Sequence, residues 1–147
     1  MEKTLVILMG IQGSGKSTFC KEYLVEFVRV NLDTLKTRHR EALLVAECIE
    51  KGESYVIDNT NPTRLDRARY IAPAKAAGYR IVGYFLESKL AVCMARNALR
   101  EGSARVPECA IASTSNKLEM PSREEGFDEL YFVKNDGKAM TVEKWRD

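Results

Sequence analysis

The feature that most constrains this chain is a glycine-rich motif of eight residues near its N-terminus. Residues 10–17 read Gly-Ile-Gln-Gly-Ser-Gly-Lys-Ser, which matches the pattern G-x-x-x-x-G-K-[ST] in full. An apolar run at residues 4–9 precedes the motif and is typical of a strand buried on both faces of a parallel sheet. Residues 17–27 after it read as a helix. A chance occurrence of the pattern need not lie between a buried strand and a helix. Its position between the two therefore favours a phosphate-binding loop.

Each part of the motif has a physical role in holding a triphosphate. The glycines permit backbone angles that turn successive N–H groups toward phosphate oxygens, and the following helix adds its positive N-terminal end. Lys16 supplies a full positive charge for the β- and γ-phosphates, and the Ser17 hydroxyl is a ligand for Mg²⁺. The predicted cofactors are therefore ATP and Mg²⁺, and the predicted phosphate-binding residues of the loop are Gly10, Gln12, Gly13, Ser14, Gly15, Lys16, Ser17 and Thr18.

The rest of the chain alternates between strand and helix patterns. Further strands are expected at residues 28–31, 54–58, 80–86 and, more weakly, 127–133. Helices are expected at residues 33–52, 61–77, 88–100 and 107–118, the second beginning at Asn61-Pro62 and kinked or broken at Pro73. This alternation predicts an α/β fold with a parallel five-stranded sheet flanked by helices, in one domain over residues 1–147. The tail from Lys134 shows only a turn at residues 135–137.

Composition excludes several other classes of protein. A net charge of +2 and a pI of about 8.3 are too mild to indicate a nucleic-acid binder by themselves. The four cysteines are scattered singly, which argues against a zinc site or a disulfide framework. No apolar run approaches the roughly 18 residues of a membrane span. We expect a cytoplasmic protein without membrane association; its oligomeric state is left open.

Two acidic residues follow predicted strands and point to the chemistry. No base-reading N-K-x-D motif of GTPases is present, since Asn116-Lys117 is followed by Leu118-Glu119. Asp33 follows the second strand, where strand ends converge on a ligand crevice, and it can accept the proton of an attacking hydroxyl or simply cap a helix. Asp58 ends the third strand at the same edge of the sheet and can contact Mg²⁺ through water, brace Ser17 or cap a turn.

Three arginines fall at the end of a predicted helix and in the loop beyond it. Arg96 and Arg100 are four residues apart and share a helix face, and Arg105 follows. Arginines that close over a γ-phosphate accelerate transfer by about 10³–10⁵. A solvated basic face near a helix C-terminus is the alternative. A short helical lid is predicted at about residues 96–110.

These segments together resemble the kinase domain of the polynucleotide kinase family, which includes the polynucleotide kinase-phosphatases. Similarity covers about residues 4–133, and the most specific stretches are Asn-x-Asp-Thr-Leu and Ile-Asp-Asn-Thr-Asn-Pro. The similar segments are residues 10–18, 30–35, 56–62, 96–97, 100, 106–107 and 125–127.

The resemblance implies transfer of the ATP γ-phosphate to a 5′-hydroxyl of DNA or RNA. It implies Asp33 as general base, Lys16 and Ser17 at the phosphates and metal, and Arg100 as the lid arginine. It also implies an adenylate-kinase-like sheet with the phosphate-loop strand in the centre. Some members of the family have an arginine three residues after the general base, where it holds the phosphate of the acceptor. This chain has Lys36 there, and a lysine cannot form the two parallel hydrogen bonds that an arginine forms with a phosphate. No D-x-D-G-T phosphatase signature is present, so we expect a kinase-only protein or the kinase module of a larger system.

The acceptor is the least constrained part of the prediction. The candidate acceptor residues are Asp33, Lys36, Arg38 and Arg64, drawn from two basic segments at residues 36–40 and 64–69 that can hold backbone phosphates or be solvated helix faces. Three hypotheses follow: a polynucleotide 5′-hydroxyl kinase, a kinase acting on a small-metabolite hydroxyl, or a nucleotide-binding module without transfer.

Overall fold

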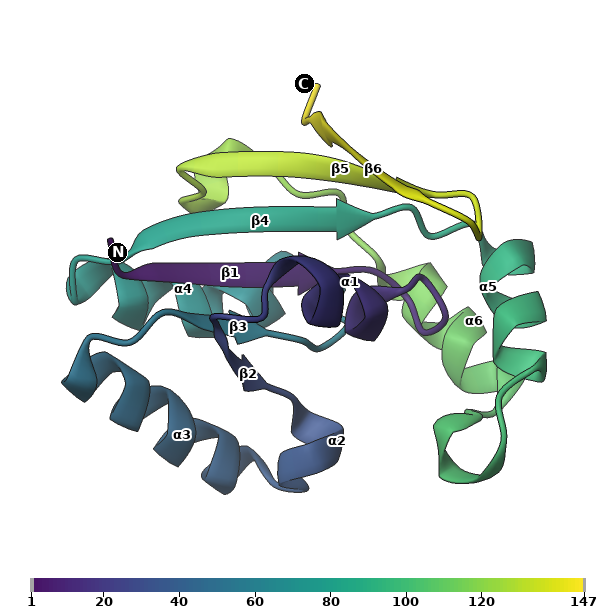
Figure 1. Ribbon diagram of the computed structural model, residues 1–147, viewed down its shortest axis with the longest axis horizontal. Helices are drawn as coiled ribbons and strands as arrows, with labels where there is room; N and C mark the ends of the chain where they lie inside the picture. The colour runs from purple at the N-terminus through teal and green to yellow at the C-terminus, as the bar shows by residue number, and fades with distance from the viewer. Residues whose placement is uncertain (1, 147) are drawn as a thin grey trace.

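The computed structural model describes residues 2–146, so the two end residues of the predicted 1–147 domain lie outside it. Strands and helices alternate along the chain (Figure 1). The strands are β1 Thr4–Met9, β2 Val28–Val30, β3 Tyr55–Ile57, β4 Arg80–Leu86, β5 Glu129–Asn135 and β6 Met140–Lys144. The helices are α1 Lys16–Tyr23, α2 Leu32–Leu35, α3 Arg38–Lys51, α4 Arg64–Ala76, α5 Leu90–Ala98 and α6 Glu108–Lys117, with 3₁₀ turns η1 Gly102–Ala104 and η2 Arg123–Glu125.

The sheet has the order β2-β3-β1-β4-β5-β6. The first five strands in this order run parallel, and β6 pairs antiparallel with β5. The predicted α/β fold, with the phosphate-loop strand β1 inside the sheet, is confirmed. Because parallel strands end at the same edge, this order brings the segments that follow β1, β2, β3 and β4 together.

The two faces of β1 pack into two separate hydrophobic layers. Leu5, Ile7 and Met9 belong to a hydrophobic cluster that includes residues of α3 and α4, while Val6 and Leu8 belong to one that includes residues of α1. All five side chains are at most 2% exposed, as expected for a continuous apolar strand covered on both sides. In Figure 1 α1 lies in front of the sheet, and α5 and α6 stand beyond the ends of β1 and β4. The edge that carries the glycine loop is therefore bordered by helices.

The sheet has six strands instead of the predicted five. Residues 136–139 join β5 to β6, and there Gly137 N–H and Lys138 N–H donate to the side chains of Asn135 and Asp136. In β6 only Met140 and Glu143 are partly buried, and the apolar Val142 is 43% exposed, so the apolar signal of this strand was weak. An Asn-Asp-Gly turn followed by alternating apolar residues is a hairpin signal, and it could have been recognised.

The long helix predicted at residues 33–52 is two helices. Lys36 has a left-handed φ of 75°, which ends α2, and the Thr37 side chain then caps α3 by accepting from the Arg40 N–H. The helix expected to reach residue 27 ends at Tyr23. Local capping chemistry overrides an apolar periodicity that continues across the break.

Helix α4 begins later than predicted and is not broken. Asn61 has φ 47°, and the cap is Thr63, which forms a capping box with Asp66. The helix runs through Pro73 to Ala76. Since Pro73 lies in the last turn, only the hydrogen bond to the carbonyl four residues earlier is lost, and the helix continues for a few residues.

Among residues 2–146, no helix combines the length and the apolar composition needed to cross a bilayer.

Candidate active site at the phosphate loop

The glycine loop joins β1 to α1 in a conformation that needs its glycines. Gly13 and Gly15 have left-handed φ values of 86° and 100°. A Cβ atom on Gly13 would lie 2.5 Å from the carbonyl oxygen of Cys93 in α5. Any side chain at residue 13 would therefore push α5 away from the loop, in addition to straining the backbone.

The Lys16 ammonium lies over this loop. Its Nζ donates to the carbonyl oxygens of Gly10 and Ile11 at 2.9 Å each. Burial among these atoms is the largest influence on Lys16 and lowers its pKa to about 8, while the nearby charge of Asp58 opposes this shift. Arg100 and Asp33 also act on Lys16, in opposite directions. The structure thus brings together four residues predicted from separate segments.

Ser17 and Asp58, the two predicted magnesium ligands, are bridged by an arginine that the sequence did not single out. Arg29 in β2 donates from Nε to Asp58 Oδ2 at 2.7 Å and from Nη2 to Ser17 Oγ at 3.3 Å. The Asp58 side chain is 1% exposed and that of Arg29 is 36% exposed. The position of Arg29 between two valines of a strand could have indicated a functional role for it. A positive charge thus lies between the two oxygens that we predicted would bind a cation.

Asp33 lies in the first turn of α2. Asn31, and not Asp33, is the N-cap, because its side chain accepts from the Thr34 N–H. Asp33 is exposed, and its carboxylate has no hydrogen bond within residues 2–146. The alternative that Asp33 serves as a cap is therefore wrong, and its carboxylate is free to meet another group.

The predicted acceptor cations lie on three different elements. Lys36 is exposed at the junction of α2 and α3. Arg38 is 54% exposed and donates from Nη1 to Glu41 Oε1 and to the Tyr70 hydroxyl, at 3.0 and 2.8 Å. Arg64 is exposed at the first position of α4. Lys36 and Arg64 are open to solvent, whereas Arg38 is already engaged in part.

The predicted lid is a short loop between α5 and α6, closed at its base. Asn97 is buried, and its side-chain amide exchanges two hydrogen bonds with the backbone of Val106, at 2.7 and 2.9 Å. Arg100 lies within the loop, where Nη1 donates to the Ala104 carbonyl at 3.4 Å. Arg96, in contrast, ties α5 to the phosphate loop and to β5 through the carbonyls of Gly13 and Asn135. The two arginines therefore differ: Arg96 is anchored and Arg100 is on the loop.

A cavity of about 320 Å³ opens beside the phosphate loop. It lies between α1, the end of α5 and the β5–β6 hairpin. Its lining includes three hairpin residues that the sequence reasoning missed: Asn135, Lys138 and Met140. Asn135 Nδ2 donates to the Ser14 carbonyl at 3.4 Å, which joins the hairpin to the loop. These residues were missed because β6 was not predicted.

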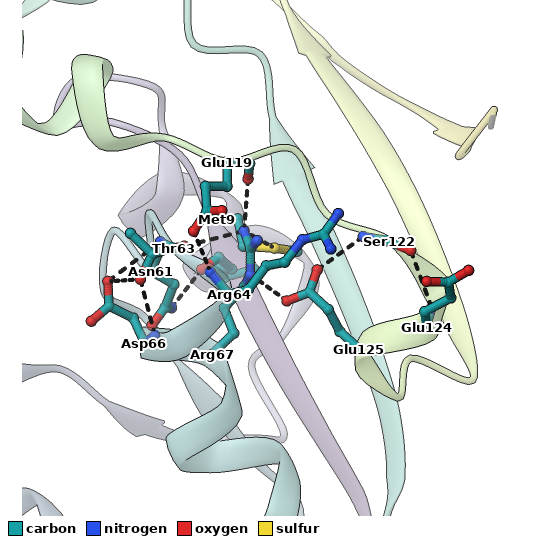
Figure 2. Close-up of polar contacts among 11 residues, drawn as sticks. Met9, Asn61, Thr63, Arg64, Asp66, Arg67, Glu119, Ser122, Glu124 and Glu125 are labelled. Carbon is teal, nitrogen blue, oxygen red and sulfur yellow. Dashed lines mark hydrogen bonds and ion pairs between the residues drawn. The ribbon is translucent and has the colours of Figure 1, made fainter.

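The basic segment that follows Asp58 does not act as one surface. Arg67 is fully buried and pairs through Nε with Glu125 Oε1 at 2.8 Å, while its Nη1 donates to the carbonyl of Glu119 at 3.0 Å. Figure 2 shows Arg67 extending from α4 toward both glutamates. The expectation that Arg67 can hold a backbone phosphate is therefore wrong, because its guanidinium is enclosed.

Comparison with known proteins places these features in a family. A model described as AAA domain (AAA_33) matches residues 38–121. The chain is 35% identical over 128 residues to a bifunctional polynucleotide phosphatase/kinase of Schizosaccharomyces pombe, covering 84% of this chain and 31% of that protein. It is 31% identical over 140 residues to a putative bifunctional polynucleotide phosphatase/kinase of Acanthamoeba polyphaga mimivirus, covering 90% and 33%. The chain spans about one third of the length of these curated relatives.

Solved structures support the fold. Kti12 of Chaetomium thermophilum, in complex with ADP-AlF3, superimposes with a TM-score of 0.70 at 14% identity, covering 90% of this chain and 89% of that one. A gluconokinase from Sinorhizobium meliloti gives a TM-score of 0.61 at 19% identity, covering 89% and 82%. The AAA domain model matches more than half of the chain, and the protein therefore belongs to the AAA domain family and has the fold of phosphate-loop kinases.

Proposed function

We propose that this protein is an ATP-dependent kinase that transfers the γ-phosphate to the 5′-hydroxyl end of a polynucleotide, DNA or RNA. The observation that carries the proposal is the unpaired Asp33 carboxylate, which lies within electrostatic reach of Lys16 at the same edge of the sheet. Relatives named polynucleotide phosphatase/kinase, similar over most of this chain, support the nucleic acid as acceptor.

In this proposal the phosphate loop holds the triphosphate. The N–H groups of residues 10–18 and the N-terminus of α1 face the phosphates, and Lys16 turns from its loop carbonyls to the β- and γ-oxygens. The nucleoside lies in the cavity lined by Asn135 and Met140, which borders the loop. Arg100, on its short loop, meets the transferring phosphoryl group, while Arg96 holds the wall of the site.

Ser17 and Asp58 are the residues that would hold Mg²⁺. Mg²⁺ takes one or two protein oxygens and completes its shell with phosphates and water, so a hydroxyl and a carboxylate fit it. Within residues 2–146, no group of three or more His, Cys, Asp or Glu side chains is arranged to hold a metal. Arg29 marks the place between the two oxygens as favourable for a cation. When bound, Mg²⁺ neutralises charge on the phosphate oxygens.

Asp33 is assigned to the acceptor. The 5′-hydroxyl gives its proton to the carboxylate as its oxygen forms a bond to the γ-phosphorus, and the bond from that phosphorus to the β–γ bridging oxygen breaks to release ADP. Lys36 and Arg64, both exposed, and the free donors of Arg38 are assigned to phosphates of the acceptor strand. The single domain over residues 1–147 and the cytoplasmic location stay predictions from the sequence.

A transfer assay with γ-labelled ATP tests the proposal. Offered 5′-hydroxyl DNA, 5′-hydroxyl RNA and a panel of small hydroxyl metabolites, the protein should label a polynucleotide end and lose acceptor affinity steeply as salt is raised. Labelling of a metabolite alone, with a salt-insensitive KM, would assign a small-molecule kinase. ATP binding without transfer to any acceptor would leave a nucleotide-binding module.

A further inference from the structure

The position of the Asp33 carboxylate depends on what holds α2. This helix has four residues, too few to be stable alone, because a helix needs more than one turn to offset its nucleation cost. No hydrogen bond fixes the Asp33 side chain within residues 2–146. The groups that attach α2 to the rest of the fold therefore determine where the carboxylate lies.

Two asparagine side chains attach the first turn of α2 to the end of β3. Asn31 accepts from the Thr34 N–H at 3.1 Å and donates from Nδ2 to the Asp58 carbonyl at 2.6 Å. Asn59 accepts from the Leu32 N–H on Oδ1 at 2.9 Å. Leu32 and Thr34 are the two neighbours of Asp33, so the Asn59 and Asn31 bonds hold the backbone on both sides of the carboxylate.

A third side chain fixes the orientation of the Asn59 amide. Asn59 Nδ2 donates to Glu41 Oε2 at 2.9 Å, and at 3.3 Å to the Tyr70 hydroxyl. A carboxylate only accepts hydrogen bonds, whereas the Leu32 N–H only donates. One amide orientation satisfies both of these partners, with the nitrogen toward Glu41 and the oxygen toward Leu32. Glu41 therefore imposes the orientation in which Asn59 can hold α2.

Glu41 is itself held rigidly between two helices. It lies in α3, is 3% exposed, and accepts on Oε1 from Arg38 Nη1 at 3.0 Å and from the Tyr70 hydroxyl of α4 at 2.9 Å. A buried carboxylate is costly unless donors surround it, and Glu41 has three. Within residues 2–146, the hydrogen-bond partners of the Glu41 carboxylate are Arg38, Tyr70 and Asn59, and none belongs to the phosphate loop or to the predicted metal ligands, so nucleotide binding does not explain its burial.

We propose that Glu41 is a positioning residue for transfer: through Asn59 it holds α2 and thereby places the Asp33 carboxylate against the acceptor hydroxyl. This inference rests on the proposed function, because it takes Asp33 to be the proton acceptor. It adds a residue that reaches the proposed base through the Asn59 amide and that also pairs with Arg38.

The first test is Glu41→Gln, which keeps the shape of the side chain but can donate or accept and so releases the amide. We expect kcat to fall about tenfold, within the roughly hundredfold loss that a misplacement of about 1 Å can cause, and the ATP Kd to stay within about twofold. Combined with Asp33→Asn, Glu41→Gln should cause no further loss, because both act on the same step. An unchanged kcat in Glu41→Gln, or an additive loss in the double variant, would overturn the proposal.

The second test reverses the polarity of the hydrogen bond. Asn59→Asp places two carboxylates against each other and should lower kcat at least as much as Glu41→Gln. Combining Asn59→Asp with Glu41→Gln restores a donor opposite an acceptor, since the introduced glutamine donates and the introduced aspartate still accepts from the Leu32 N–H. We expect this pair to recover kcat to within about threefold of the natural protein. A pair no better than Asn59→Asp alone would contradict the proposed route.

Tyr70→Phe is the control for loss of packing and hydrogen bonding. It removes one donor to Glu41, the longer contact with Asn59 and the hydroxyl that accepts from Arg38, but it leaves the bond between Glu41 and Asn59. We expect a lower midpoint of urea unfolding with kcat within about twofold of the natural value; a kcat as low as in Glu41→Gln would make the effect a general loss of stability.

Asp33→Asn alone separates the inference from the proposed function. Full activity in Asp33→Asn removes the general base and this inference together. If Asp33→Asn lowers kcat but Glu41→Gln does not, only the inference about Glu41 is wrong and the proposed function stands.

Discussion

Two arginine–carboxylate pairs in this protein have nearly the same geometry and different surroundings. Arg29 and Asp58 are joined by an Nε–O distance of 2.7 Å, and Arg67 and Glu125 by 2.8 Å. The Arg29 side chain is 36% exposed at the edge of the phosphate loop, whereas that of Arg67 is 0% exposed between α4 and η2. Both arginines form an ion pair, but only Arg29 is open to solvent. Exposure therefore determines which of the two can change its partner.

The buried pair cannot exchange its partners. Arg67 also reaches the carbonyls of Asn61 and Glu119 and the sulfur of Met9, while its Nη2 has no partner among the described residues (Figure 2). Leaving this guanidinium without its carboxylate would strand a charge in the core. The pair at the loop is the opposite case, because the Arg29 side chain is 36% exposed and can move into solvent.

The largest expected effect is on the buried pair. Glu125→Ala should lower the free energy of unfolding by about 3–5 kcal/mol, because a buried charge loses its partner. Urea unfolding measures this, and Glu124→Ala, an exposed neighbour of the same type, should stay within about 0.5 kcal/mol of the natural protein. A loss below about 1 kcal/mol for Glu125→Ala would remove the distinction between the two pairs.

Neutralising Asp33 should lower the rate of transfer and leave the stability of the fold nearly unchanged. Asp33→Asn should lower kcat by at least roughly 10²-fold, the lower range for general base catalysis, with little change in stability or ATP affinity. Steady-state transfer and a separate ATP-binding titration measure the two quantities, with Glu26→Gln, also an exposed acid, as the control. If Asp33→Asn lowers ATP affinity as well as kcat, Asp33 has a structural role.

Lys16 should make nucleotide affinity depend on pH. Its pKa is lowered to about 8 mainly by burial, and phosphates favour the protonated form, so binding is strongest below this pKa and weakens as pH rises through it. At pH 9 about one Lys16 in ten is protonated, which predicts ATP affinity about tenfold weaker than at pH 7. Calorimetry in two buffers at about pH 8.5 should show proton uptake on binding. Lys16→Arg, which does not titrate in this range, should remove the pH slope; a slope that persists would assign it to another group.

The smallest expected effect is at the exposed pair. Arg29→Ala should lower the unfolding free energy by less than Glu125→Ala does, because Arg29 itself is 36% exposed and water can reach the buried Asp58 carboxylate in its place. It should lower the Mg²⁺ concentration needed for half-maximal transfer, since Asp58 and Ser17 lose a competing cation. Mn²⁺ binding, followed by its magnetic resonance signal in the absence of acceptor, gives a readout independent of turnover. Arg29→Lys should fall between Arg29→Ala and the natural protein, and a higher metal requirement in Arg29→Ala would show that Arg29 assists binding of the metal.

The sequence predicted the loop and the order of elements because both are local. The eight residues of the loop are contiguous, and the apolar run of β1 is followed directly by its turn. The capping of α3 by Thr37 and of α4 by Thr63 was equally local, but a longer apolar periodicity concealed it. Strand β6 was missed because its residues are at most partly buried, which leaves a weak apolar pattern.

The sequence by itself determined that a glycine loop with Lys16 and Ser17 follows a buried strand, since adjacent residues specify backbone angles and donor positions without help from elsewhere. Tertiary structure alone decided the partners of Arg67 and Arg29. Arg67 meets Glu125 across 58 positions and Arg29 meets Asp58 across 29, and nothing in the local pattern distinguishes a buried arginine from an exposed one. The physical reason is that desolvation and hydrogen bonding depend on which distant segments pack together.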